Sequence, residues 1–304
     1  MHPINTVEGL LFRAYLSGYN LSFLHRCINL KDEEIDTPGY RQAAHASSDL
    51  DFEKKTDRAK RLTDILIHQS GKNEILPFFH PQYPKQLLTI KNYPQLLFVK
   101  GQLPFHKCAA IIGTRDPSPF AAQKTNKVVN IFAEQDYGII SGLALGIDTL
   151  AHEAALQCRT YTAAILPRPI DHIYPEANKA LAQRIIENGG ALISEQAPNF
   201  APVGNSFVLR NRIQAAMSTV VMPIEMGKDS GTYHTINFAI KYGRKTIIPK
   251  PTGHETKLHA LQYEGLLQAI KKCKGSPHFV LLHKLSQLRE ALLDQVTKQG
   301  YFEF

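Results

Sequence analysis

The sequence predicts an α/β protein: an extended Rossmann-like, doubly wound and mostly parallel sheet, with a small helical domain at the N-terminus. Three observations support this fold class. From residue 107 onward, short apolar runs alternate with amphipathic helical stretches, and each run ends in a loop rich in Gly, Pro or Ser. The first 70 residues show helical patterns instead. We therefore expect two domains, residues 1–70 and residues 71–304, with the sheet in the second.

The N-terminal domain is expected to be helical. Apolar residues at helical spacing predict helices over Val7–Tyr15, Leu21–Ile28 and Arg58–Gln69. Thr6 is placed to cap the first of these helices with its hydroxyl group. Residues 31–61 are charged and poor in aliphatic side chains, so they form either an exposed linker with a solvated helix or the rim of a small bundle. After them, the apolar run Leu96–Val99 predicts a strand.

The second domain is expected to alternate strands and helices to its end. Six apolar runs predict parallel strands, at Cys108–Ile112, Gly138–Ile140, Thr162–Leu166, Ala191–Ile193, Thr219–Ile224 and Lys245–Pro249. Helical stretches lie between them, near Phe120–Gln135, Asp148–Gln157, Glu176–Asn188, Val208–Ala216 and Thr232–Tyr242. The tail predicts a helix at Leu258–Cys273, a strand at His278–Leu282 and a helix at Ser286–Val296, with no C-terminal winged helix. In such sheets ligands bind at the carboxyl ends of the strands, where the strand order reverses.

The composition is that of a globular protein with a mild basic excess. Apolar residues make up 43% and charged residues 20% of the chain, which excludes a disordered or fibrous protein. Lys and Arg number 35 against 27 Asp and Glu, and the net charge of +8 suits a polyanionic partner such as nucleic acid. Residues 107–250 hold 15 basic and 11 acidic side chains, which is half of the excess. Because the charge is spread, folding must assemble any basic site.

The cysteine and histidine patterns predict no metal site, no cofactor and no disulfide framework. The four cysteines lie far apart without a CxxC spacing, at Cys27, Cys108, Cys158 and Cys273, so we expect reduced thiols. None of the 13 histidines falls in an HExxH pattern. The N-terminus lacks the features of a signal peptide, and no stretch approaches the roughly 18 apolar residues of a membrane span. We expect a soluble, cytoplasmic protein with no membrane partner.

Four loops at the ends of predicted strands have the chemistry of an anion site. Gly113–Arg115 and Ser141–Asp148 place glycines before a helix N-terminus, where free N–H groups and the helix dipole favour phosphate. Ser206–Arg212 adds two arginines and a ring on which a base can stack, and Asp229–Thr232 adds hydroxyls and a glycine. Each loop alone also fits an ordinary turn, a capping aspartate or arginines paired with nearby carboxylates. Together, at one rim of the sheet, they predict a single phosphate-binding site.

The same segments resemble a known family. From about Phe78 to Pro251 the chain is similar to the DprA/Smf family (DNA-processing protein A), and the matching motifs occur in the family's order and spacing: GTRDPSPF, SGLALGIDTLAHEAAL, DHIYP, ISE, SFVLRNRI and DSGTYHT followed by AIKYGRK. The resemblance implies a protein, usually homodimeric, that binds and protects incoming single-stranded DNA. It also implies that the protein loads a RecA-type recombinase in natural transformation, with no established catalysis and no cofactor.

The resemblance further implies roles for individual residues. The DNA contacts would come from Arg115, Phe207, Arg210 and Arg212, with Thr114, Ser206 and Asn211 beside them. The phosphate-cradling loops would contain Gly113, Ser141, Gly142, Gly146, Ser230, Gly231 and Thr232. Asp148 and Glu195 would support the pocket structurally, and no residue is expected to be catalytic or to bind a metal.

The chain departs from the family pattern in places, and two other functions stay open. The loop after the third strand, usually rich in glycine, is here Pro167–Asp171, which is stiffer and carries an extra cation. A nucleotide enzyme of the phosphoribohydrolase type is the first alternative. Against it, His234 and Thr235 stand near where its catalytic glutamate would be needed, with Glu195 or Asp148 as substitutes. A sensor of a free nucleotide or of a nucleotide-derived signal is the second alternative.

Overall fold

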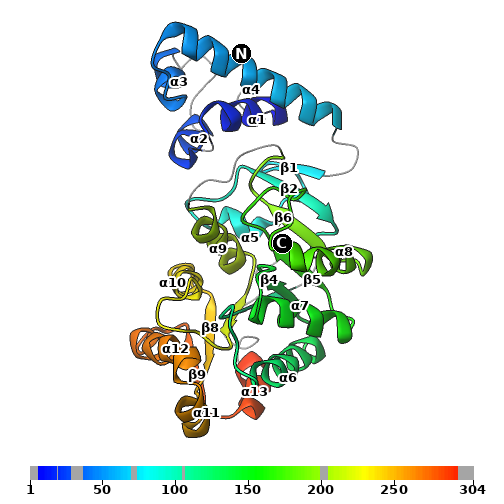
Figure 1. Cartoon of the computed structure of the whole chain (residues 1–304), viewed down its shortest axis with the longest axis vertical. Helices are drawn as coiled ribbons and strands as arrows, with labels where there is room; N and C mark the ends of the chain where they lie inside the picture. The colour runs from blue at the N-terminus through cyan, green and yellow to red at the C-terminus, as the bar shows by residue number, and fades with distance from the viewer. Residues whose placement is uncertain are drawn as a thin grey trace.

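The structure, a computed structural model, describes residues 6–18, 20–28, 37–69, 74–104, 107–198 and 205–293. Its centre is a nine-stranded, mostly parallel sheet with helices on both faces, and four N-terminal helices pack at one end of the sheet (Figure 1). The predicted fold class is therefore confirmed. Within these described ranges, no helix is both long enough and apolar enough to cross a membrane.

The N-terminal helices form a small bundle. They are α1 (Val7–Leu16), α2 (Leu21–Ile28), α3 (Thr37–Ala43) and α4 (Asp49–Gln69). Thr6 caps α1, because its Oγ1 accepts a hydrogen bond from Gly9 N at 3.0 Å. The bundle packs on the sheet, where Tyr15 OH donates to Pro198 O at 3.0 Å. The first part of the charged segment, residues 31–36, lies outside the described residues.

The helix α4 is longer than the sequence predicts. It begins at Asp49 rather than at Arg58, and Ser48 Oγ accepts a hydrogen bond from Asp51 N at 3.1 Å at this start. Mean apolarity is low along α4, but Ala59, Thr63 and Leu66 share one helical face and are buried. The helix packs against α1, so its charged surface is the rim of a bundle.

The strands lie in the order β1-β2-β6-β5-β4-β3-β7-β8-β9. Their bounds are β1 Glu74–Pro77, β2 Leu96–Gly101, β3 Cys108–Ile112, β4 Gly138–Ser141, β5 Thr162–Ile165, β6 Ala191–Ser194, β7 Val220–Pro223, β8 Lys245–Pro249 and β9 Phe279–Leu282. The six predicted parallel strands are present to within one residue at each end. The sequence pattern does not predict β1, which pairs antiparallel with β2 at the edge of the sheet.

Helices cover both faces of the sheet, which explains why the central strands are buried and nearly all apolar (Figure 1). One face carries α6 (Ala121–Glu134), α7 (Ile147–Gln157) and α8 (Lys179–Glu187). The other face carries α5 (Lys85–Leu88), α9 (Ser206–Ala216), α10 (Thr232–Lys241) and α12 (Ala260–Cys273). The predicted alternation of strands and helices is thus present through this part of the chain.

The C-terminal segment differs from the prediction in detail. A separate helix, α11 (Gly253–Leu258), precedes α12, because Thr252 and Glu255 form a reciprocal capping box. The last predicted helix begins as a 3-10 turn and continues as α13 (Leu288–Leu293). Its expected end at Val296 lies outside the described residues.

The order of the parallel strands reverses at β3. β4 pairs with β3 on one side, and β7, which comes three strands later in the chain, pairs with it on the other. The loops that follow β3 and β7 therefore diverge to opposite faces of the sheet. Such a switch point leaves a crevice at the carboxyl ends of the two strands, which is where ligands bind in this class of sheet.

Candidate functional site

A cavity of about 440 Å³ opens at the switch point. Its walls come from the loop after β3, the start of α7, one face of α9 and the loop between β7 and α10. Ten residues that the sequence singles out line it: Gly113, Thr114, Arg115, Asp148, Phe207, Arg210, Asn211, Ser230, Gly231 and Thr232. The fold thus brings to one rim the four loops that the sequence predicts to act together.

Hydrogen bonds join these loops to one another. Thr114 N donates to Glu225 O at 2.8 Å, and Ile147 N donates to Thr114 O at 3.1 Å. Thr232 Oγ1 donates to Gly113 O at 3.1 Å. The loops after β3, β4 and β7 therefore hold one another in place, so the cavity is preformed and needs no ligand to assemble it.

Two glycines allow the close packing of the wall. A Cβ added to Gly142 would lie 2.1 Å from Arg210 Nη1 and 2.6 Å from Asp148 Oδ2. Gly146 has φ +79°, in the left-handed region, and an added Cβ there would lie 2.3 Å from Thr114 O. The glycine pattern after β4 therefore serves the approach of this loop to α9 and to the loop after β3.

Arg210 is a buried cation in the wall of the cavity. Its Nη1 donates to Gly142 O at 2.8 Å and also to Ile165 O, and its Nε donates to Asn211 Oδ1 at 3.1 Å. These bonds use three of the five N–H donors of the guanidinium, and the two donors on Nη2 bond to no described residue. Burial lowers the pKa of Arg210 to about 10, opposed by the charge of Asp148, so Arg210 remains a cation at neutral pH.

Two titratable side chains of α7 lie near Arg210, and one of them, Asp148, also lines the cavity. Asp148 Oδ2 accepts hydrogen bonds from Gly142 N at 3.1 Å and Ala144 N at 3.4 Å, which fixes the loop after β4. Burial raises the pKa of Asp148, and the charge of Arg210 partly opposes this. His152 is fully buried with Nδ1 2.7 Å from Thr162 Oγ1, and burial lowers its pKa to about 3.

A row of two rings and two guanidinium groups extends from the mouth of the cavity. We call Arg115, Phe207, Tyr174 and Arg168 the stacking row. Arg115 Cζ lies 5.6 Å from the ring centroid of Phe207, and Arg168 Cζ lies 4.3 Å from that of Tyr174. The two rings are edge to face, with centroids 6.0 Å apart. The sequence predicts Arg115 and Phe207 at the site but not Tyr174, although Tyr174 stands within the DHIYP motif.

Arg212 does not line the cavity. It is 2% exposed, and its guanidinium makes a bidentate ion pair with Glu195, Nη2 to Oε2 at 2.6 Å and Nη1 to Oε1 at 3.0 Å. Its Nε donates to Asn92 O and its Nη1 also to Leu209 O, so four of its five donors are used. Residues two apart on a helix point in nearly opposite directions, which separates Arg212 from Arg210.

Other residues differ from the expected placement. Ser141 is fully buried, where its Oγ donates to Ile111 O at 2.7 Å, and Ser206 is buried at the start of α9. Gln214 and Lys228 line the cavity although the sequence analysis does not assign them to the site. Helical spacing is the signal for Gln214, because it follows the cavity-lining Arg210 by four residues on the same face of α9.

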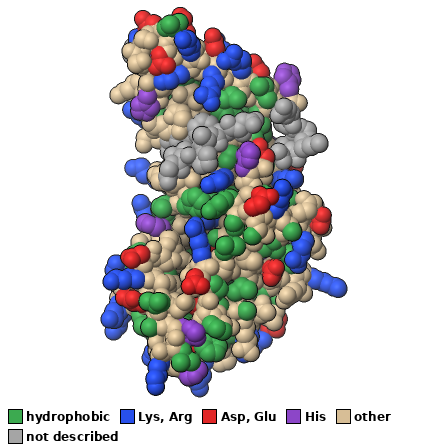
Figure 2. All heavy atoms as spheres, in the orientation of Figure 1, with side chains coloured by type: hydrophobic (Ala, Val, Ile, Leu, Met, Phe, Trp, Pro, Cys, Tyr) green, Lys and Arg blue, Asp and Glu red, His purple; other side chains and the backbone are tan. Residues whose placement is uncertain are grey.

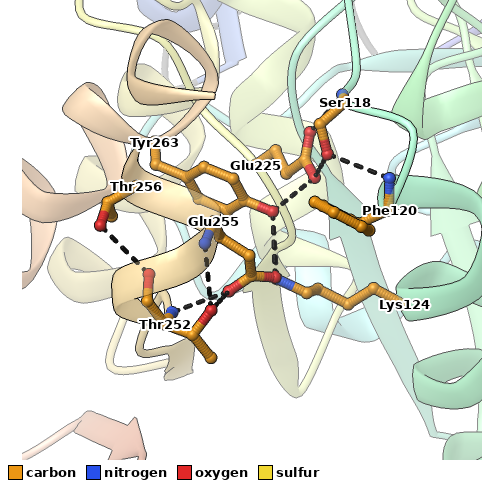
Figure 3. A network of polar contacts seen from close by, with 8 residues as sticks. All are labelled: Ser118, Phe120, Lys124, Glu225, Thr252, Glu255, Thr256 and Tyr263. Atoms are coloured by element: carbon orange, nitrogen blue, oxygen red, sulfur yellow. Dashed lines mark hydrogen bonds and ion pairs between the residues drawn. The ribbon is translucent and has the colours of Figure 1, made fainter. Parts of the chain in front are cut away.

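A network of buried and partly buried polar side chains holds the loop after β3 (Figure 3). We call it the buttress, and it consists of Ser118, Lys124, Glu225, Glu255 and Tyr263. The carboxylate of Glu225 accepts hydrogen bonds from Ser118 N at 2.7 Å, Ser118 Oγ at 2.6 Å and Tyr263 OH at 2.7 Å. Lys124 forms an ion pair with Glu255 and lies over the ring of Tyr263. The buttress ties the loop that carries Arg115 to α11 and α12.

The charge around the cavity is mildly positive. Arg115, Arg210 and Lys228 line it against Asp148 and Asp229. On the face of the molecule drawn in Figure 2, the Lys and Arg side chains of the described residues are interspersed with Asp and Glu. Among the same residues, no three His, Cys, Asp or Glu side chains are grouped so that they could hold a metal ion. The arrangement is suited to an anion that also presents a flat ring.

Comparison with known proteins gives a consistent match. The family model of DNA recombination-mediator protein A matches residues 74–273. Protein Smf of Escherichia coli (strain K12) is 35% identical over 185 residues, 60% of this chain and 50% of that protein. DNA processing protein DprA of Streptococcus pneumoniae is 40% identical over 164 residues, 53% of this chain and 57% of that protein. The chain spans about half the length of the curated relatives it matches.

Two solved structures have similar folds. DNA processing protein A from Streptococcus pneumoniae superposes with a TM-score of 0.74 at 25% identity, over 97% of this chain and 99% of that one. DNA processing protein A from Helicobacter pylori, described for its single-stranded DNA binding mode, gives a TM-score of 0.62 at 27% identity. That match covers 74% of this chain and 97% of the Helicobacter pylori chain.

Proposed function

The chain belongs to the DNA recombination-mediator protein A family, as its motifs predict, and from that premise we propose that it binds single-stranded DNA at the switch-point cavity. The observation that carries the proposal is the pairing of Arg115 with the ring of Phe207 at the mouth of a preformed cavity. A cation beside a ring matches the two repeating parts of a nucleic-acid strand, the phosphate and the base. The single-stranded DNA binding described for the Helicobacter pylori relative supports the same ligand.

Phosphate groups would be held by cations and by the positive end of a helix dipole. Arg115 is exposed, and two donors of Arg210 have no acceptor among the residues that the structure describes, so both arginines can donate to phosphate oxygens. Ser230–Thr232 adds hydroxyls and the N-terminus of α10, where the helix dipole favours an anion. Arg212 would not contact the DNA; its ion pair with Glu195 would hold α9, and with it Arg210, in position.

The base would stack on Phe207. In duplex DNA the bases are paired and stacked on one another, so a ring on the protein surface reaches only an unpaired base. Phe207 is half-buried in α9 and held edge to face by Tyr174, which fixes the position of its ring. Stacking on Phe207 therefore accounts for a preference for single-stranded over duplex DNA, and it does not depend on which base is bound.

The wider role follows the family. We propose that the protein protects single-stranded DNA in the cytoplasm and passes it to a RecA-type recombinase during DNA recombination and natural transformation, as a homodimer. Copurification of the recombinase with this protein tests this part of the proposal.

We assign the cavity to binding rather than to nucleotide hydrolysis. Glu195 is paired with Arg212 away from the cavity, and the buried carboxylate of Asp148 accepts hydrogen bonds from two loop amides. Glu195 does not line the cavity, and Asp148, which does, has its carboxylate engaged with the loop amides, so we assign neither of them the role of a general acid or base. Incubation with nucleoside monophosphates followed by chromatography tests this assignment, and release of free base by the wild-type protein would overturn it.

Gel shift with a labelled single-stranded oligonucleotide tests the binding proposal. Unlabelled single strands should displace the probe more effectively than a duplex of the same sequence, and nucleoside monophosphates should displace it weakly. Equal competition by duplex would contradict the proposal. Strong competition by a nucleoside monophosphate would favour a sensor of free nucleotides, which uses the same cavity.

A further inference from the structure

We propose that Arg168 and Tyr174 form a second nucleotide subsite, which holds the base and phosphate next to the nucleotide bound at Phe207. This inference rests on the proposed function, because it concerns the path of the same single strand. The stacking row contains two ring-and-guanidinium pairs, Arg115 with Phe207 and Arg168 with Tyr174, and the two rings are in contact. Each pair offers one ring and one cation, the groups that one nucleotide requires.

The ring of Tyr174 is open to a ligand. Tyr174 is 44% exposed, although it contacts both Phe207 and Arg168. A second, smaller cavity of about 50 Å³ is lined by both rings and shares the lining residues Arg115 and Arg210 with the first. Leu145, which is 47% exposed, also lines it. An exposed ring and an exposed leucine around one hollow form a surface that a flat, partly apolar base can cover.

Within the described part of the chain, one donor of the Arg168 guanidinium lacks an acceptor. Its Nε is buried and has no hydrogen-bond partner among the described residues. A buried N–H group that lacks an acceptor is unfavourable, and a charged one more so. A phosphate oxygen of the strand at this position would accept from Arg168, just as another phosphate would accept from Arg115.

The loop that carries Arg168 differs from the family pattern. It is usually rich in glycine, whereas here two prolines, Pro167 and Pro169, flank Arg168. Proline restricts φ, so this loop holds Arg168 with less conformational freedom than a glycine-rich loop would. A fixed cation over an exposed ring loses less conformational entropy when a ligand binds. The second subsite is therefore a property of this chain's own residues.

The test compares ligands of increasing length on matched variants. Tyr174→Ala should weaken the binding of oligothymidylate about tenfold, since stacking of one base on an aromatic ring is worth roughly 1–3 kcal/mol and 1.4 kcal/mol is tenfold. Tyr174→Phe should bind like the wild type, because it keeps the ring. Arg168→Ala should also weaken binding and should reduce the slope of log affinity against log salt by about 1, whereas Tyr174→Ala should leave the slope unchanged.

A mononucleotide provides the length control. Thymidine monophosphate fills only the first subsite, so Arg168→Ala and Tyr174→Phe should leave its affinity unchanged, and Tyr174→Ala should weaken its binding much less than that of oligothymidylate. The pair Lys272 and Tyr233 provides the positional control. Lys272 Nζ lies 4.5 Å from the ring of Tyr233, but Tyr233 lines neither cavity, whereas Tyr174 lines the second. Tyr233→Ala should bind oligothymidylate like the wild type.

The outcomes separate this inference from the proposed function. If Arg115→Ala weakens oligothymidylate binding while Tyr174→Ala and Arg168→Ala do not, the strand leaves the cavity by another route and only the second subsite is overturned. The second subsite is also overturned if Tyr233→Ala weakens binding as much as Tyr174→Ala. If the wild-type protein shows no preference for single strands, the proposed function itself fails.

Discussion

The buttress and the stacking row meet in the loop after β3, which carries Ser118 and Arg115. The polar groups of the buttress are hydrogen-bonded within the protein, whereas the stacking row stays partly open to solvent. In the buttress, Glu225 is fully buried and its carboxylate accepts hydrogen bonds from Ser118 and Tyr263. In the stacking row, Arg115 is exposed and Tyr174 keeps 44% of its surface exposed. The loop is thus fixed at Ser118 and presents Arg115, three residues earlier, to the cavity.

The two arginines of α9 repeat this contrast. Arg212 uses four of its five donors within the protein, whereas Arg210 uses three and lines the cavity. Groups whose hydrogen bonds are complete within the protein stabilise the fold. Groups that keep donors or surface open are available to a ligand. Substitutions in the first set should therefore change the free energy of unfolding, and those in the second set should change affinity.

The largest expected effect on stability comes from Arg212. Arg212→Ala removes the ion-pair partner of the half-buried Glu195 carboxylate. Breaking a buried ion pair in this way costs about 3–5 kcal/mol of unfolding free energy. Denaturant unfolding followed by circular dichroism measures this. The double variant Arg212→Ala with Glu195→Ala should recover part of the loss. An unchanged unfolding free energy together with lost DNA binding would place Arg212 in the ligand site instead.

Glu225→Gln should destabilise the protein by about 1.5–3 kcal/mol, because the hydrogen bonds that Glu225 accepts are made to a charged group and an amide cannot accept on both sides. Chemical unfolding measures the loss. Single-stranded DNA affinity at a temperature where the variant is folded should fall only slightly. A large loss of affinity with no loss of stability would show that the buttress acts on the ligand directly.

A pH-dependent effect on stability is expected from His152. Its pKa is about 3 in the folded protein and 6.5 without the fold, so below pH 6.5 the unfolded chain binds a proton that the folded chain does not. Its contribution to stability is complete above pH 6.5 and is lost toward pH 3, at up to about 1.4 kcal/mol per pH unit. His152→Gln should flatten this dependence, whereas the exposed His172→Asn should not. Identical pH profiles for wild type and His152→Gln would contradict the account.

The sequence predicts the sheet and the rim well because their signals are local. The central parallel strands are buried on both faces and so read as apolar runs, and the loops after β3, β4 and β7 follow such runs. The pattern misses β1, where only four residues pair at an edge with the non-local β2. Tyr174 escapes prediction for a similar reason, since only the fold brings it beside Phe207. Arg212 is different, because helical geometry alone shows that it faces away from Arg210.

The central claim is that the switch-point cavity binds single-stranded DNA through Arg115. Titration of labelled oligothymidylate by fluorescence anisotropy at several salt concentrations, with wild type, Arg115→Ala and Arg289→Ala, tests it most directly. Arg289 is a matched control because it is an exposed cation paired with Glu134 and lies outside both cavities. Arg115→Ala should unfold within about 0.5 kcal/mol of wild type, since the residue is on the surface. It should nevertheless bind about tenfold or more weakly, with a salt slope lower by about 1, while Arg289→Ala should retain most of the wild-type affinity. Equal affinity and slope for wild type and Arg115→Ala would contradict the claim.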